Sequence, residues 1–233
     1  MIKEQLIKKS PLRILEKSLN GGLGAGQMGV LAARKGVGKT ACLVHIATDA
    51  LLHGKNVLHI SFADDPKHIV RWYEQVFHEV AKSYKLDNVM EVHDELIRRR
   101  LILHFKKVGV NFAEIQANIE QIKTGLSASP DLIIVDGFPF TDDSQERLEE
   151  WRSYAVLGLV PLWFSATTYV ETSESDLAPE IEQVADLFEV IILLHQQPDY
   201  IDLRLWKSPV AAQSQSLNLK LDPKTLLISN HRV

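Results

Sequence analysis

Apolar residues along the chain fall into short runs that alternate with segments of helical periodicity. Short apolar runs bounded by turn signals are typical of strands buried in a parallel sheet, and apolar side chains that recur every three or four positions indicate helices packed on it. Strand–helix alternation predicts a mostly parallel central sheet flanked by helices. We expect strands at residues 56–62, 101–105, 132–135, 160–165 and 188–194, and helices at 40–53, 66–100 (two, joined near 85–88), 111–126, 142–157 and 178–186.

The two ends of the chain have a different pattern. Residues 1–19 predict a short helix broken near Pro11, and the glycine-rich stretch 20–26 predicts a loop, so that 1–28 form a lead-in. In the tail, residues 200–233 predict antiparallel hairpin strands at 201–206, 217–221 and 226–229. No internal repeat or linker divides the chain, which predicts a single α/β domain over residues 1–233.

The composition narrows the class of function. Hydrophobic residues make up 45% and charged residues 24% of the 233 residues, which is ordinary for a soluble globular protein. The net charge of −4 gives no positive field that would draw the chain to nucleic acid or to an anionic membrane. Cys42 is the only cysteine, and the sequence has neither a signal peptide nor an apolar stretch long enough to span a bilayer. We therefore expect a cytoplasmic protein.

The chemistry of the chain concentrates between Gly29 and Ala50, where a short apolar strand is followed by a glycine-bearing turn and a helix. Gly36 and Gly38 allow successive backbone N–H groups to curl around phosphate oxygens at a helix N-terminus. Lys39 adds a mobile positive charge, and the hydroxyl of Thr40 is a ligand for Mg²⁺. The segment predicts a phosphate-binding loop made of Arg34, Lys35, Gly36, Val37, Gly38, Lys39, Thr40 and Ala41. It departs from the pattern G-x-x-x-x-G-K-[ST] at Ala33, where the pattern has glycine.

A second acidic residue is needed to hold the metal at the end of a neighbouring strand. Asp136 follows four consecutive apolar residues, 132–135, which suits a central strand covered on both faces. Thr40 and Asp136 are therefore the predicted Mg²⁺ ligands.

With these motifs in place, the chain resembles the RecA-like ATPases, above all the KaiC group and replicative helicases of the DnaB type. In the helicases an Ala-Ala-Arg opening to the loop is familiar, so Ala33 is similar to a family variant. The resemblance implies ATP as the ligand and Mg²⁺ as the cofactor. It covers most of the chain, over residues 19–41, 56–65, 131–137, 160–168 and 186–210.

The resemblance also implies a general base, usually glutamate, just after the second strand. The corresponding position here is Ala63 or Asp64. Asp64 is the predicted base, because it is a carboxylate one methylene shorter than glutamate, and Asp65 is the second choice or a helix cap. The alternative is two acidic residues in a turn, with weak hydrolysis or none.

Relatives of this kind usually form rings in which a neighbour supplies a Lys-x-Arg pair to the γ-phosphate. Lys207 matches the lysine, whereas Pro209 stands where the arginine is expected. Arg204 either compensates for that arginine or is an ordinary strand residue. Ser165, Thr167 and Thr168 stand where the family often keeps a polar γ-phosphate sensor.

Other polar and aromatic groups are assigned to structure. The basic runs 98–100 and 106–107 either flank a strand as a solvated helix end or contact an acidic partner, and Trp72, Tyr73 and Phe77 have the spacing of a core or interface cluster. The nine histidines show no metal-ligand spacing.

Three functions follow from these residues. The first is a slow Mg²⁺-dependent ATPase that acts as a regulatory or assembly switch, with ATP or ADP as ligand and with a homo-oligomer (ring or dimer) and an unidentified protein as partners. The second is a pseudo-ATPase binding module, because a glutamate at Ala63 and an arginine at Pro209 are missing. The third is a DNA-translocating or recombination motor, against which the acidic total argues.

Overall fold

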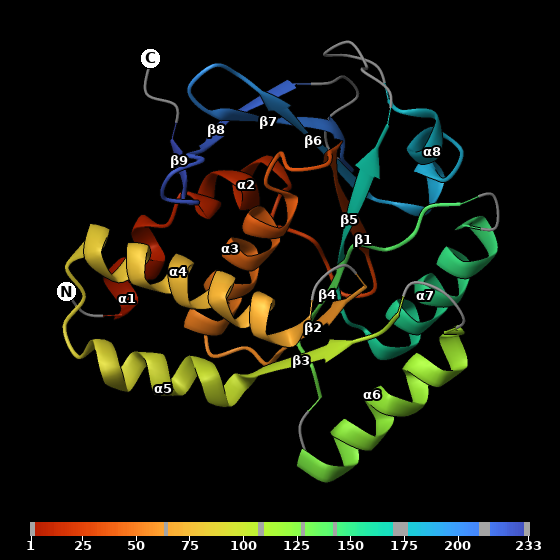
Figure 1. Cartoon of the computed structure of the whole chain (residues 1–233), viewed down its shortest axis with the longest axis horizontal. Helices are drawn as coiled ribbons and strands as arrows, with labels where there is room; N and C mark the ends of the chain where they lie inside the picture. Colours follow the sequence, from red (N-terminus) through yellow and green to blue (C-terminus); the bar gives the residue numbers. More distant parts are fainter. Residues whose placement is uncertain are drawn as a thin grey trace.

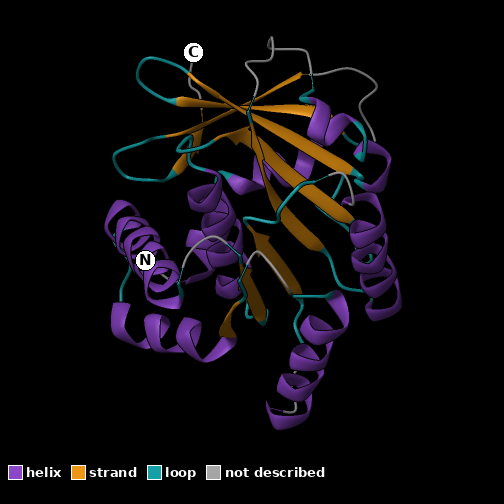
Figure 2. Cartoon of the chain, turned by 45° about the vertical axis from the view of Figure 1, so that its right-hand side comes forward, coloured by secondary structure: helices purple, strands orange, loops and turns teal. Residues whose placement is uncertain are grey.

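The computed structural model describes residues 3–62, 65–106, 110–126, 129–141, 144–169, 177–209 and 215–230. Across these ranges nine strands form one sheet, in the order β3-β2-β4-β5-β1-β6-β7-β8-β9. Helices lie on both sides of this twisted sheet (Figures 1 and 2).

The strands are β1 (Met28–Arg34), β2 (Val57–Ser61), β3 (Arg100–His104), β4 (Leu132–Asp136), β5 (Leu162–Thr168), β6 (Val190–Gln196), β7 (Ile201–Lys207), β8 (Gln215–Leu221) and β9 (Ile228–Asn230). The α-helices are α1 (Lys3–Lys9), α2 (Leu12–Ser18), α3 (Lys39–Leu52), α4 (Pro66–Tyr84), α5 (Val89–Arg99), α6 (Phe112–Leu126), α7 (Ser144–Gly158) and α8 (Pro179–Glu182), and η1 (Ala185–Leu187) is a 3₁₀ turn.

The first six strands in chain order pair in parallel, and β7, β8 and β9 continue the sheet as antiparallel strands. Every residue of β2 and β4 is buried, as expected of strands with helices on both faces. The predicted α/β fold, with a mostly parallel sheet and antiparallel strands at the C-terminal end, is confirmed. The assignment of residues 1–233 to one domain stays a prediction.

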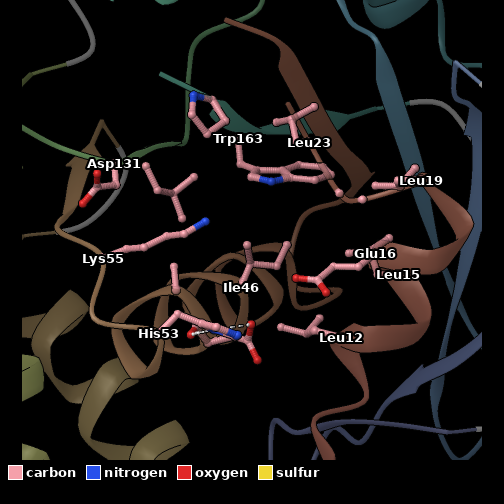
Figure 3. Close-up of a pocket in the computed structure, with 16 residues that line it drawn as sticks. Leu12, Leu15, Glu16, Leu19, Leu23, Ile46, His53, Lys55, Asp131 and Trp163 are labelled. Atoms are coloured by element: carbon pink, nitrogen blue, oxygen red, sulfur yellow. Dashed lines mark hydrogen bonds and ion pairs between the residues drawn. The ribbon is translucent and has the colours of Figure 1, made fainter. Parts of the chain in front are cut away.

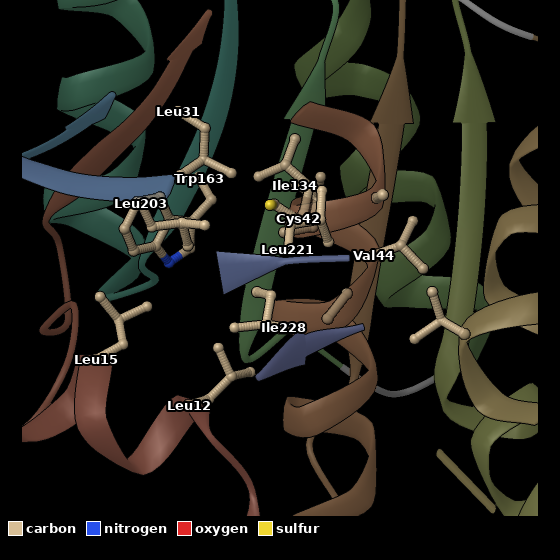
Figure 4. Packing of buried hydrophobic residues seen from close by; sticks show 14 of the residues in the cluster. Leu12, Leu15, Leu31, Cys42, Val44, Ile134, Trp163, Leu203, Leu221 and Ile228 are labelled. Carbon is tan, nitrogen blue, oxygen red and sulfur yellow. The ribbon is translucent and has the colours of Figure 1, made fainter. Parts of the chain in front are cut away.

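Two apolar cores lie on the two faces of the sheet. One joins α2, α3, α4 and α5 to the sheet, and the other lies under α6, α7 and α8. Figure 4 shows how the lead-in joins the first core, since Leu12 and Leu15 of α2 point toward Ile228, Leu203 and Trp163. The lead-in therefore packs against both the phosphate-loop helix and the C-terminal strands.

Two predicted elements have different bounds. The helix expected at 178–186 is wrong, because α8 ends at Glu182 and a turn leads into η1. This turn buries Ile181 and Val184 while it directs the chain into β6. The strand expected at 160–165 runs from Leu162 to Thr168, in parallel register with all seven residues of β1. Pairing with β1, which the local sequence does not encode, sets these bounds.

Gly29 provides a test of the close packing under β1. An added Cβ atom would lie 2.7 Å from the nearest carbon of the Trp163 ring, which is buried on the adjacent strand. We expect Gly29→Ala to lower the free energy of unfolding by about 1–3 kcal/mol, measured by urea denaturation, since overpacking forces a buried ring to move. Gly125→Ala is the matched control, because its Cβ would meet no atom within 4 Å and alanine favours the helix. Equal stability of the two variants would contradict this packing.

His45 of α3 links the phosphate-loop helix to β9 and makes stability depend on pH. Its Nδ1 accepts a hydrogen bond of 2.9 Å from the N–H of Ile228. Burial lowers the pKa of His45 to about 4, and the nearby carboxylate of Asp49 opposes that shift. Below pH about 6.5 the unfolded chain therefore takes up a proton that the folded chain refuses, so this contribution to stability is complete at higher pH and is lost as the pH falls toward 4.

We expect His45 to account for a loss of about 1–2 kcal/mol in unfolding free energy between pH about 6.5 and about 5. His45→Gln keeps a hydrogen-bond acceptor and does not titrate, so its urea-unfolding free energy should fall less over that range. Identical pH dependence in the parent and the variant would contradict this assignment.

Candidate nucleotide-binding site

The phosphate loop connects the end of β1 to the start of α3. Gly36 and Gly38 have φ angles of +85° and +104°, in the left-handed region that favours glycine. At Gly38 a Cβ atom would lie 2.6 Å from Cδ2 of Leu221 and 3.4 Å from Cδ1 of Ile201. The C-terminal strands thus press against the loop, and only glycine fits at the helix N-terminus, where unpaired N–H groups favour an anion.

Lys39 is folded back onto this loop. Its ammonium group donates hydrogen bonds of 2.9 Å to the carbonyl oxygens of Ala33 and Arg34. Burial lowers the pKa of Lys39 to about 8, and the negative charge of Asp136 partly opposes this shift. An ammonium group has three N–H donors, so beyond these two bonds one remains for an anionic ligand.

Asp136 lies at the carboxyl end of β4, beside the start of α3. Its Oδ2 accepts a 2.9 Å hydrogen bond from the Thr40 hydroxyl, and its Oδ1 accepts a 2.6 Å bond from the Ser165 hydroxyl. Ser165 also accepts a bond from the N–H of Gly137. The fold therefore brings together Thr40 and Asp136, which lie 96 positions apart and which the sequence pairs as metal ligands. A hydroxyl and a carboxylate are hard oxygen donors of the kind that Mg²⁺ prefers.

Two further buried polar residues lie behind Asp136, and the sequence analysis did not assign them to the site. His59 of β2 is fully buried, with its Nε2 4.0 Å from Oδ2 of Asp136. Its Nδ1 lies 3.1 Å from the hydroxyl of Tyr73, a residue assigned above to the core or an interface. Burial lowers the pKa of His59 to about 4 and raises that of Tyr73. The available signal was a polar residue inside an otherwise apolar strand adjacent to β4.

A cavity of about 200 Å³ opens beside the loop at the carboxyl edge of the sheet. The ends of β1, β5 and β6 and the loop itself line it, through residues that include Ala33, Arg34, Val37, Thr168, His195 and Gln196. The cavity adjoins the loop carbonyl oxygens that Lys39 contacts. Together, the glycine loop, the lysine and the oxygen donors fit the phosphates of a nucleotide with bound Mg²⁺.

Lys207 lies near the opposite edge of the sheet. It stands opposite Ile191 on β6, which in turn pairs with Val30 in the first half of β1. The loop begins after Arg34, about 13 Å further along the strand. The Lys207 ammonium group donates a 2.9 Å hydrogen bond to the carbonyl oxygen of Ala185. Within one chain, Lys207 and the phosphate loop are therefore not brought together.

The remaining predicted site residues are partly accounted for. Ala63 and Asp64, including the predicted base, lie outside the described residues. Asp65 caps α4 by accepting a 3.1 Å hydrogen bond from the N–H of His68, which lowers its pKa. Arg204 pairs with Asp202 at 3.0 Å on its own strand.

The basic run at the end of α5 is largely tied to nearby groups. Arg98 donates to the carbonyl oxygen of Asp94, and Arg99 lies 3.7 Å from the carboxylate of Glu95. The Arg100 guanidinium lies 4.6 Å from the centre of the Tyr73 ring. These contacts favour a structural role for the run over a nucleic-acid contact.

A second cavity, of about 130 Å³, lies between α2 and α3 at the amino edge of the sheet. Figure 3 shows the Trp163 ring above Ile46, with Leu23 beside it and Lys55 and Asp131 at the other end. None of the loop residues from Arg34 to Ala41 lines this cavity. It is separate from the nucleotide site.

Two absences bound the chemistry further. The described residues contain no cluster of three or more His, Cys, Asp or Glu side chains able to hold a metal ion. Across the same ranges, no helix has the length and apolar character needed to cross a bilayer.

The comparisons with known proteins agree with this geometry. A family model described as "AAA domain" matches residues 3–150, which is more than half of the chain. A solved structure of the ATPase domain of a DnaB-like helicase superposes with a TM-score of 0.71 at 16% sequence identity, over 94% of this chain and 89% of that chain, and so shares the fold. No curated protein matches the sequence. The chain belongs to the AAA domain family and has the fold of a RecA-like P-loop ATPase.

Proposed function

We infer that this P-loop ATPase domain binds ATP with Mg²⁺, hydrolyses it slowly, and uses the bound nucleotide as a regulatory or assembly switch. The observation that carries this proposal is the direct contact between Thr40 and Asp136 beside the folded-back Lys39. Three segments far apart in sequence supply the glycine loop, the carboxylate and the adjoining cavity. Their chemistry matches a nucleotide polyphosphate better than a neutral ligand.

Each residue has a distinct part in this proposal. Lys39 would neutralise phosphate charge, and the N–H groups at the start of α3 would orient the phosphate oxygens. Thr40 and Asp136 would hold Mg²⁺, which when bound neutralises charge on the β- and γ-phosphates. Asp64 would orient the attacking water. Ser165, through its bond to Asp136, would hold that carboxylate in place.

Slow turnover follows from what surrounds this centre. Pro209 has no side-chain donor where relatives carry an arginine, and the absence of an arginine finger lowers phosphoryl-transfer rates by about 10³–10⁵. Lys207 lies near the far edge of the sheet, so its contact with a γ-phosphate would require a second copy of the chain. We therefore propose a homo-oligomer whose assembly depends on nucleotide.

Phosphate release and particle mass, measured together, test this proposal. With Mg²⁺ and ATP we expect a larger particle by light scattering and turnover below about 1 s⁻¹, the lower end of ordinary enzyme rates. Lys207→Ala should lower turnover without weakening ATP binding to the single chain. An unchanged particle mass together with no phosphate release would contradict the switch.

A catalytically impaired binding module is the second candidate, favoured by Pro209 and by alanine at position 63. It predicts ATP binding and assembly without turnover, whereas turnover that survives purification and disappears in Asp64→Asn would exclude it. The DNA motor remains the third candidate, with the net charge of −4 against it. DNA-stimulated turnover would restore the motor, and its absence would remove it.

A further inference from the structure

A pair of buried polar residues lies directly behind the proposed metal-binding carboxylate. His59 is 0% exposed, and both Tyr73 and Asp136 are 2% exposed, so these three groups share surroundings from which water is excluded. They come from β2, α4 and β4, which the fold brings side by side. Polar groups in such surroundings interact strongly because the local dielectric constant is low.

The contacts of His59 define which ring nitrogen carries the proton. The ring is neutral, since burial disfavours its charged form, and so it has one N–H donor and one acceptor. Nδ1 lies 3.1 Å from the Tyr73 hydroxyl, while Nε2 faces the carboxylate of Asp136. A carboxylate attracts an N–H group and repels a nitrogen lone pair. The favoured arrangement has the Tyr73 hydroxyl donating to Nδ1 and the N–H on Nε2, directed at Asp136.

This N–H group has no hydrogen-bond partner among the described residues. The nearest carboxylate oxygen, Oδ2 of Asp136, is 4.0 Å away, beyond hydrogen-bond distance but within reach of a carboxylate shift of about 1 Å. Leaving a buried donor unpaired costs about 1–3 kcal/mol. The same oxygen accepts the bond from Thr40, so His59 acts on the atom that faces the second metal ligand.

We propose that His59, fixed by Tyr73, is a positioning residue that orients the Asp136 carboxylate for the metal that accompanies the nucleotide. This inference rests on the proposed function, because it assumes that Asp136 and Thr40 hold Mg²⁺. His59 does not touch the nucleotide or the metal in this account. Its N–H group restrains the carboxylate from the side opposite Thr40, as outer partners of metal ligands do.

The effect of Mg²⁺ on ADP affinity tests the role without requiring turnover. Calorimetric titrations with ADP, in Mg²⁺ and in EDTA, give the ratio of the two affinities for each variant. We expect His59→Leu to reduce this ratio by about tenfold, the lower end of the loss seen when such outer partners are removed. ADP affinity in EDTA should stay near that of the parent.

Two conservative variants distinguish positioning from packing. His59→Gln retains an N–H donor near the Nε2 position and should keep most of the Mg²⁺ effect. Tyr73→Phe keeps the ring but removes the hydroxyl that fixes the tautomer, so it should show a smaller loss than His59→Leu. His45→Leu is the matched control, because this other buried histidine bonds Ile228 and does not face Asp136. It should be less stable yet retain the full Mg²⁺ effect.

A full Mg²⁺ effect in folded His59→Leu would overturn the positioning role. If that variant fails to fold, a full effect in Tyr73→Phe would overturn it instead. Equal losses in His59→Leu and His59→Gln would also overturn it, because they would show that the ring shape matters and the donor does not. A parent chain that binds ADP equally with and without Mg²⁺ would overturn this inference together with the metal site of the proposed function. The parent titration thus separates the two failures.

Discussion

Lys39→Ala is expected to weaken ATP binding by about a hundredfold or more and to abolish turnover. A hydrogen bond to a charged group contributes about 1.5–3 kcal/mol, and Lys39 would form at least two such bonds to phosphate oxygens after releasing the loop carbonyl oxygens of Ala33 and Arg34. A loss of about 3 kcal/mol corresponds to about a hundredfold in affinity. Calorimetric titration with ATP and Mg²⁺ measures the change.

Lys17→Ala is the matched control for this experiment. Lys17 is an exposed lysine of α2, outside the residues of the proposed nucleotide site. The control removes one positive charge from the chain as a whole, and we expect ATP affinity close to that of the parent. Equal affinities in the parent and in Lys39→Ala would mean that the loop does not bind the phosphates, and would refute the site.

Asp136→Asn is expected to lower phosphate release by at least about a hundredfold and to remove most of the Mg²⁺ dependence of nucleotide binding. The substitution keeps the side-chain shape but removes the negative charge that would hold the metal. An amide also cannot accept hydrogen bonds through both of its terminal atoms, so either Thr40 or Ser165 would lose its acceptor. Steady-state phosphate release and nucleotide titration in Mg²⁺ and EDTA measure the two effects.

Asp131→Asn provides the same change of residue type just before the other end of β4. Asp131 accepts a 2.7 Å hydrogen bond from the N–H of Asn56, at the amino edge of the sheet. Its replacement should affect local stability and leave the Mg²⁺ effect intact. If both aspartate variants retained the parental Mg²⁺ effect, Asp136 would not be a metal ligand.

The sequence was most informative where one contiguous segment contains the chemistry. The loop from Gly36 to Thr40 follows from glycine conformation, the helix N-terminus and one lysine, all of which are local properties. Asp136 was found because an apolar run that ends in aspartate marks the end of a buried strand. The order of strands that sets Asp136 beside Thr40 depends on pairing between distant segments, but the family resemblance implied it.

Other features depend on contacts that local sequence does not encode. The bounds of β5 are set by pairing with β1, and the chain turns after α8 because Ile181 and Val184 must both be buried before β6. The hydroxyl of Ser165, predicted as a phosphate sensor, is directed at Asp136. His59 was one histidine among nine until the fold placed it behind that carboxylate.

The central claim is that the loop from Gly36 to Thr40, together with Asp136, forms a Mg²⁺–nucleotide site. Calorimetric titration of the full chain with a non-hydrolysable ATP analogue, in Mg²⁺ and in EDTA, tests it most directly. We predict saturable binding of one nucleotide per chain, tighter by about tenfold or more in Mg²⁺. No saturable binding in either buffer, or equal affinity in both, would contradict the claim.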